Sequence, residues 1–153
     1  DPVTGVPNHR VLAEFHLAVS EEVFKPDRRV FFLTFHITNL AELYETHSVD
    51  RGDAYLKQLM ALFSKMIPAQ KFIFRLSETC FLIMLMDRDQ KETEHLKSKL
   101  KHLLEHNPLN VNGVSMEAHT QWGVSTYPDD GRELFSLINQ SRTRLAQTTK
   151  AMA

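Results

Sequence analysis

Few residues of this 153-residue chain could do chemistry, and the most suggestive are one histidine and the single cysteine. His36 and Cys80 each lie in an apolar run that we predict to be a strand. If the two strands are neighbours, the imidazole and the thiol would lie close together, and such a pair suggests a zinc site. Structural zinc needs a tetrahedral set of ligands, usually with recognisable cysteine or histidine spacing, and the chain has no second cysteine. We therefore interpret His36 as a polar strand-end residue and predict no metal site.

Cysteine and histidine could also act as a reactive thiol and as a pH switch. Cys80 would be a reactive thiol if a cation such as Arg75 lowered its pKa, whereas an inert, partly buried strand cysteine is the more common case. Several of the eight histidines could form a pH switch, but they are scattered along the chain. His95, His102 and His106 lie on a charged segment, where we expect them to be exposed to solvent.

The composition is that of a soluble globular domain. Hydrophobic residues make up 42% and charged residues 24%, which excludes disordered and collagen-like classes. The net charge of -1 does not provide the excess of positive charge that is typical of proteins that bind nucleic acid or an acidic membrane surface. The longest uncharged run, residues 30–41, is shorter than the roughly 18 apolar residues of a membrane span. The lone cysteine fits a reducing compartment, so we predict a cytoplasmic location.

Hydrophobic periodicity predicts the elements that would position these residues. An amphipathic helix begins near Asn8 and ends before Pro26. The run 30–37 is apolar on both faces, as expected of a central strand. Short polar links and apolar stripes predict the remaining elements: helices at 39–47 and from 52 to 67, strands at 71–76 and 80–86, a helix at 90–106, one long or two broken strands within 114–127, and a final helix from 134 to 145.

From residue 30 onward the expected order is strand, helix, strand, strand, helix, strand. This is the split β-α-β order of ferredoxin-like folds, an α+β class with a central antiparallel sheet covered by helices. We predict a single domain over residues 1–153. Because the chain opens at Asp1 without a leader, we expect it to be a piece of a longer protein.

Two segments carry a resemblance to a known family. The opening residues 1–10, DPVTGVPNHR, and the late residues 122–131, WGVSTYPDDG, resemble the corresponding segments of GGDEF domains, the diguanylate cyclases that join two GTP molecules into cyclic di-GMP. The order of strands and hairpin between them is also what the family fold requires. The resemblance therefore covers the whole chain and implies the same nucleotide-cyclase-type βαββαβ architecture.

The signature hairpin departs from the family pattern. Where the family carries Gly-Gly-Asp-Glu-Phe after an arginine and one variable residue, this chain has Ser77, Glu78, Thr79, Cys80 and Phe81. The resemblance implies that the two lost carboxylates would bind magnesium and assist attack by the ribose hydroxyl. The lost glycines would let the backbone approach the triphosphate without a Cβ in the way. Arg75 and Phe81 alone match the pattern.

The other positions implied by the resemblance have also changed. His36 and Thr38 stand where the family has metal-binding aspartates, and Tyr44 and Glu45 replace the Asn-Asp pair that recognises guanine. Residues 68–71, PAQK, replace the Arg-x-x-Asp product site. Magnesium requires hard oxygen ligands, usually carboxylates, so we predict no catalytic residues, no metal and no cofactor.

These observations predict a catalytically inactive, degenerate GGDEF domain that acts as a regulatory or protein-interaction module in bacterial cyclic di-GMP signalling. Its expected partner is another protein or an adjacent sensor or EAL-type domain of the same chain, with a homodimer also open and with no nucleic acid or direct membrane contact. The alternative is a non-catalytic sensor of GTP or cyclic di-GMP. It would use a remnant pocket formed by Arg75, Glu45, Tyr44 and His36.

Overall fold

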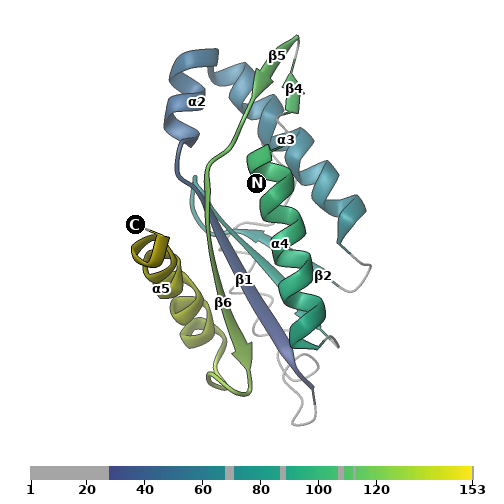
Figure 1. Ribbon diagram of the computed structural model, residues 1–153, viewed down its shortest axis with the longest axis vertical. Coiled ribbons are helices and arrows are strands. Elements are labelled where there is room, and N and C mark those ends of the chain that lie inside the picture. The colour runs from purple at the N-terminus through teal and green to yellow at the C-terminus, as the bar shows by residue number, and fades with distance from the viewer. Residues whose placement is uncertain (1–27, 68–70, 87–88, 107–108, 112, 153) are drawn as a thin grey trace.

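The computed structural model describes residues 28–67, 71–86, 89–106, 109–111 and 113–152 (Figure 1). The predicted first helix lies outside these residues. The described elements are β1 (Val30–Ile37), α2 (Leu40–His47), α3 (Val49–Met66), β2 (Lys71–Arg75), β3 (Cys80–Met86), α4 (Gln90–His106), β4 (Leu109–Val111), β5 (Val114–Met116), β6 (Thr120–Tyr127) and α5 (Leu134–Met152).

The main sheet has the strand order β2-β3-β1-β6, and every neighbouring pair is antiparallel. This confirms the predicted α+β fold and the central position of β1. The expected strand region 114–127 is broken at residues 117–119 into β5 and β6. The prediction missed β4, which pairs with β5 in a separate two-stranded sheet.

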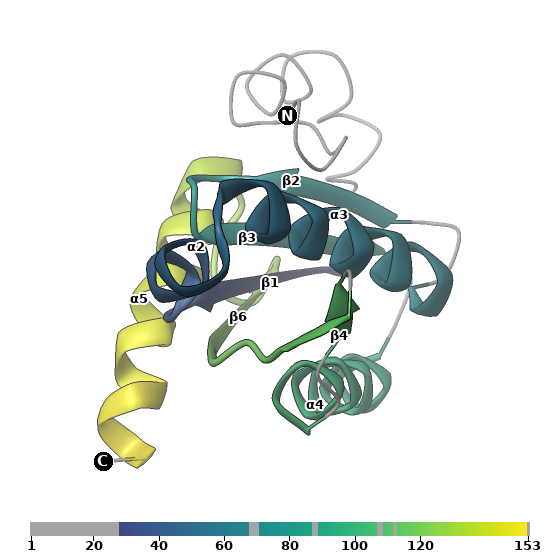
Figure 2. The same ribbon diagram turned by 90° about the horizontal axis from the view of Figure 1, so that it is seen from above.

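Two layers of helices cover the sheet, with α4 and α5 on opposite sides (Figure 2). Alternate residues of β1 explain this arrangement, since successive strand side chains point to opposite faces. Phe31, Leu33 and Phe35 pack with the apolar stripes of α3 and α4. Val30 and Phe32 pack with Leu134, Leu137 and Ile138 of α5.

An aromatic cluster forms the centre of the face covered by α3. The Phe35 ring stacks on Trp122 with centroids 4.8 Å apart and on Phe81 at 5.1 Å. Phe63 of α3 meets the same ring edge-on at 5.4 Å. Because each such pair contributes about 0.5–1.5 kcal/mol beyond area burial, the cluster ties β1, β3, β6 and α3 into one unit.

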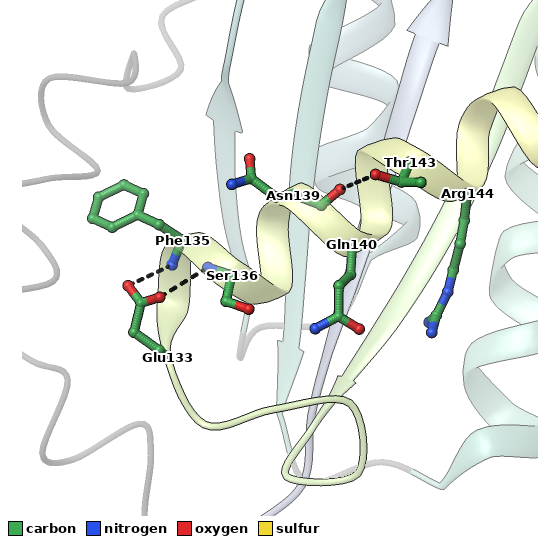
Figure 3. Close-up of a pocket in the computed structure, with 7 residues that line it drawn as sticks. All are labelled: Glu133, Phe135, Ser136, Asn139, Gln140, Thr143 and Arg144. Atoms are coloured by element: carbon green, nitrogen blue, oxygen red, sulfur yellow. Dashed lines mark hydrogen bonds between the residues drawn. The ribbon is translucent and has the colours of Figure 1, made fainter.

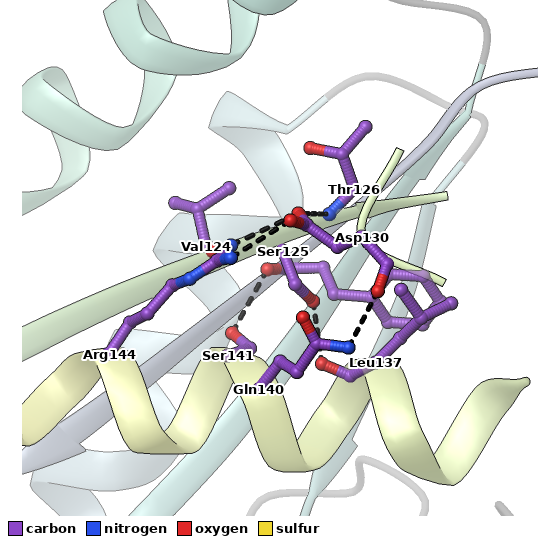
Figure 4. Close-up of polar contacts among 9 residues, drawn as sticks. Val124, Ser125, Thr126, Asp130, Leu137, Gln140, Ser141 and Arg144 are labelled. Atoms are coloured by element: carbon purple, nitrogen blue, oxygen red, sulfur yellow. Dashed lines mark hydrogen bonds and ion pairs between the residues drawn. The ribbon is translucent and has the colours of Figure 1, made fainter. Parts of the chain in front are cut away.

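Buried polar groups, several of them drawn in Figure 4, and a close backbone approach specify the docking of α5. The Ser141 hydroxyl lies 2.8 Å from the Thr34 hydroxyl and 3.0 Å from the Gly123 carbonyl oxygen. The Ser125 hydroxyl donates to the Leu137 carbonyl at 2.6 Å. A Cβ at Gly123 would lie 2.0 Å from the Ser141 carbonyl oxygen, so only glycine permits this contact.

An ion pair fixes the turn between β6 and α5. Arg144 donates to both carboxylate oxygens of Asp130, at 2.8 and 3.0 Å. The same carboxylate accepts a hydrogen bond from the Thr126 backbone N–H at 2.7 Å, and Gln140 donates to the Asp130 carbonyl at 2.7 Å. The hydrogen bond from Arg144 is the main reason that the pKa of Asp130 is lowered.

Candidate functional site

The predicted site residues lie around the C-terminal end of β1 and the β2–β3 turn. The Ile37 N–H donates to the Thr79 carbonyl at 2.9 Å, and the Thr38 N–H donates to the His119 carbonyl at 2.8 Å. The end of β1 is therefore tied to the turn on one side and to the segment before β6 on the other.

His36 and Cys80 lie on neighbouring strands, as the sequence suggested, and the register places them directly opposite each other. His36 is half-buried and Cys80 is buried. Burial raises the pKa of the Cys80 thiol, with Arg142 opposing the shift. A raised pKa keeps the free thiol protonated at neutral pH, so Cys80 is not an activated nucleophile there.

The polar side chains after β1 hold the chain in place. The Thr38 hydroxyl donates to the His119 carbonyl at 3.2 Å. The Asn39 amide donates to the Glu117 carbonyl at 2.9 Å and accepts from the His119 N–H at 2.8 Å. These groups fasten the start of α2 to residues 117–119, which explains why the strand is interrupted at that point.

The β2–β3 turn is closed by its own backbone and by Arg75. The N–H groups of Leu76 and Ser77 both donate to the Cys80 carbonyl, at 2.8 and 3.2 Å. Arg75 donates to the carbonyl oxygens of Ser77 and Glu78 at 3.3 and 2.6 Å. Its guanidinium carbon lies 5.4 Å from the centre of the Phe81 ring. Arg75 therefore stabilises the turn, and the backbone N–H groups of Leu76 and Ser77 already have hydrogen-bond partners within it.

Tyr44 and Asp53 form a polar cluster with Arg75 on the same side of the sheet. The Tyr44 hydroxyl of α2 donates to an Asp53 carboxylate oxygen of α3 at 2.6 Å. The Tyr44 ring lies so close to Gly52 that an added Cβ would be 2.5 Å from two ring carbons. Burial and Asp53 raise the pKa of Tyr44 to about 12, and the nearby Arg75 charge opposes that rise.

The structure thus brings together two of the four residues proposed for the remnant pocket. Tyr44 and Arg75 are neighbours, and Glu45 is exposed on α2. His36 points to the opposite face of the sheet, because it pairs with Cys80, whereas Arg75 lies over Phe81, the next residue along β3. Sequence reasoning used Gly52-Asp53 only to mark a helix start and missed the contact between Asp53 and Tyr44.

The residues at the expected metal positions do not fit magnesium. They offer an imidazole, a soft sulfur ligand and the hydroxyls of Thr38 and Thr79, whereas magnesium is held in proteins by carboxylates and other hard oxygen ligands. Within the described part of the chain, no group of three or more histidine, cysteine or acidic side chains is arranged to hold a metal ion.

A separate open pocket lies alongside α5 (Figure 3). Its lining includes Glu133, Phe135, Asn139 and Arg144. Glu133 accepts hydrogen bonds from the N–H groups of Phe135 and Ser136 at 3.3 and 3.2 Å, so its carboxylate caps the start of α5. The pocket does not include any of the predicted site residues.

Among the described residues, no helix is both long enough and apolar enough to cross a membrane. The comparison with protein families gives one match: the family described as "Diguanylate cyclase, GGDEF domain" matches residues 1–153. No curated protein matches the chain.

Solved structures share the fold. A sensory box/GGDEF family protein from Caulobacter crescentus is 24% identical, with a TM-score of 0.85 over 99% of this chain and 97% of that one. The FimX GGDEF domain from Pseudomonas aeruginosa is 17% identical, with a TM-score of 0.85 over 99% and 93% of the two chains. The diguanylate cyclase SiaD from the same organism, crystallised with its activator SiaC, is 17% identical, with a TM-score of 0.83 over 99% and 58%.

Proposed function

The chain belongs to the GGDEF domain family, and we propose that it is a member that has lost cyclic di-GMP synthesis and acts as a regulatory or protein-interaction module in cyclic di-GMP signalling. The proposal rests on the side chains that could bind a metal ion at the end of β1 and in the β2–β3 turn. His36, Thr38, Thr79 and Cys80 provide no carboxylate there. Phosphoryl transfer depends on metal ions and positioned charge, so the reaction lacks its main source of transition-state stabilisation.

The β2–β3 turn supports the same conclusion for the phosphate groups. Ser77 and Glu78 add side chains where the family has glycines, and the Glu78 carboxylate would repel a triphosphate. The amides of Leu76 and Ser77 are used by the Cys80 carbonyl and are not directed at a ligand. Arg75 is engaged by the turn carbonyls, which reduces its value as a phosphate ligand.

The position of the Tyr44 side chain supports the proposal that this chain does not recognise a guanine base. Its ring lies on Gly52 and its hydroxyl is held by Asp53, so the α2–α3 surface is filled by the protein's own aromatic side chain. A planar base would have to displace a ring that is anchored by a short hydrogen bond. Such displacement costs binding free energy, because the broken contacts must be replaced.

A regulatory role is consistent with how the fold has been kept. The Phe35 cluster and the α5 docking contacts hold the fold together without using the residues at the family's catalytic positions. The structurally similar SiaD is described in complex with a protein activator, which shows that a chain containing this fold can form such a complex. We propose a protein or an adjacent domain as the partner of this chain.

The cluster of Tyr44, Asp53 and Arg75 favours one second candidate, a non-catalytic sensor of GTP or cyclic di-GMP. The cluster places a cation and a carboxylate close together on one surface, and both types of group recognise nucleotides. In this case Tyr44 would have to move, and Arg75 would exchange turn carbonyls for phosphate oxygens.

Calorimetric titration with GTP and, separately, cyclic di-GMP in the presence of magnesium separates the candidates. The proposed module gives no binding heat at millimolar nucleotide. The sensor gives binding that is lost in Arg75→Ala, without new product in the GTP mixture. Binding of GTP accompanied by formation of cyclic di-GMP would refute both candidates. The variant Lys57→Ala, on the exposed surface of α3, is a control for nonspecific loss of a cation.

A further inference from the structure

The exposed surface of α4 carries two histidines that are one helical turn apart. His102 and His106 are both exposed to solvent, and their ring centroids are 4.6 Å apart with the planes inclined by 35°. Residues at positions i and i+4 lie on the same side of a helix, which explains the contact. We propose that this pair binds a divalent transition-metal ion of the zinc, nickel and copper class.

The chemistry of the pair selects that class of ion. Neutral imidazole nitrogens suit zinc, nickel and copper, whereas magnesium and calcium prefer oxygen ligands. Two histidines at the same i, i+4 spacing on one helix supply two of the three protein ligands to zinc in the H-E-x-x-H metalloproteases. Here they would supply two ligands from one rigid helix face, and water would complete the coordination.

The position of the pair on α4 also favours a cation. His106 is the last residue of α4, and the C-terminal end of a helix carries the negative end of its dipole. The helix end is fixed to the sheet, because Thr120 of β6 donates to the Glu105 carboxylate at 3.1 Å and accepts from the Trp122 indole at 2.8 Å. A fixed backbone lowers the ordering cost of bringing two ligands to one ion.

The site is independent of the proposed loss of cyclase activity. It uses none of the residues at the end of β1 or in the β2–β3 turn, and it lies on a different element from the Tyr44 cluster. From the sequence we predicted that these histidines are exposed residues of a charged helix, and the structure confirms their exposure. The neighbouring ring positions became evident only from the structure.

Calorimetric titration of the full chain with Zn²⁺, and separately with Cu²⁺ in a weakly coordinating buffer, tests the proposal. We expect one equivalent of either ion to bind. His102→Gln and His106→Gln should each weaken affinity by roughly tenfold or more, because even indirect partners of metal ligands change affinity about 10–100-fold. Mg²⁺ should not compete.

His95→Gln is the matched control. It removes an exposed histidine from the same helix, two turns before His102, where no histidine lies one turn away. This variant should retain the wild-type affinity, and circular dichroism without metal should show equal helix content in all variants. The proposal is overturned if wild type fails to bind, if both glutamine variants at 102 and 106 bind as tightly as wild type, or if His95→Gln loses affinity equally.

Discussion

The α5–β6 side and the end of β1 with the β2–β3 turn differ in what their polar groups do. On the α5 side, Thr34, Ser125 and Ser141 are fully buried and hydrogen-bonded, and helix and strand meet at Gly123. At the β2–β3 turn, Ser77 and Glu78 are exposed, and the Arg75 side chain donates to the turn's own carbonyls. This difference agrees with the proposed function, in which the packing that specifies the fold does not depend on the residues at the family's catalytic positions.

Gly123→Ala should give the largest effect, because the new Cβ would meet the Ser141 carbonyl oxygen at 2.0 Å and the Leu145 nitrogen at 3.0 Å. Backbone atoms of a docked helix cannot move aside as a side-chain tip can. We expect a loss of about 3 kcal/mol or more in the free energy of unfolding, measured by urea denaturation. A loss below about 1 kcal/mol would show that α5 docks more loosely than described.

Asp130→Asn should have an intermediate, pH-dependent effect. The pKa of Asp130 is lowered in the folded state, so its stabilising contribution is present above the unfolded pKa of about 3.9 and is lost as pH falls through the lower folded value. Because the pair is partly exposed, we expect a cost of about 1 kcal/mol at pH 7. Urea denaturation of both proteins from pH 7 to pH 3 should show the difference shrinking below about pH 4. A difference that grows on acidification would contradict this account.

Ser48→Gly should change stability in the opposite direction. Ser48 joins α2 to α3 with φ 107° and ψ 161°, a region that is essentially restricted to glycine and costs other residues about 1–3 kcal/mol. Its hydroxyl accepts from the Arg51 N–H at 3.3 Å, and replacing such a cap by glycine costs only about a few tenths of a kcal/mol. We expect a net gain of about 1 kcal/mol in urea denaturation. Ser48→Ala, which keeps the strain and loses the cap, should be destabilised.

Gly52→Ala should give the smallest effect and is the counterpart of Gly123→Ala. The new Cβ would meet only the Tyr44 ring, which is half-buried and can move, and alanine favours the helix by about 1 kcal/mol over glycine. We expect a change in unfolding free energy within about 1 kcal/mol. The movement should show in the pKa of Tyr44, which should fall from about 12 when the hydroxyl leaves Asp53. Ultraviolet titration, with Tyr44→Phe to identify the signal, measures this; an unchanged titration would mean that the ring has not moved.

The sequence was sufficient where hydrophobic pattern and turn chemistry agree. The run 30–37 is apolar on both faces and forms the central β1, and the Ser77–Thr79 link forms the predicted hairpin. The start of α3 at Val49 was missed, because the strained Ser48 caps it and sequence patterns do not reveal backbone strain. The break at 117–119 depends on Asn39, whose partners are about 80 residues away along the chain.

The candidate site was harder to predict, because its arrangement depends on contacts between elements. Register and strand alternation place His36 away from Arg75, although both stand at expected pocket positions. The contact between Tyr44 and Asp53 spans two helices and has no local sequence signal. The same holds for the neighbouring rings of His102 and His106, since helical spacing permits their contact without requiring it.

Product analysis of the purified chain incubated with GTP and Mg²⁺ tests most directly whether cyclic di-GMP synthesis has been lost. The protein concentration and the incubation time are those at which an active GGDEF cyclase, assayed in parallel, converts all of its GTP. We expect no cyclic di-GMP above the amount in a mixture without protein. Cyclic di-GMP that accumulates in proportion to the protein, and that is lost when Arg75 and Glu78 are replaced by alanine and glutamine, would contradict it.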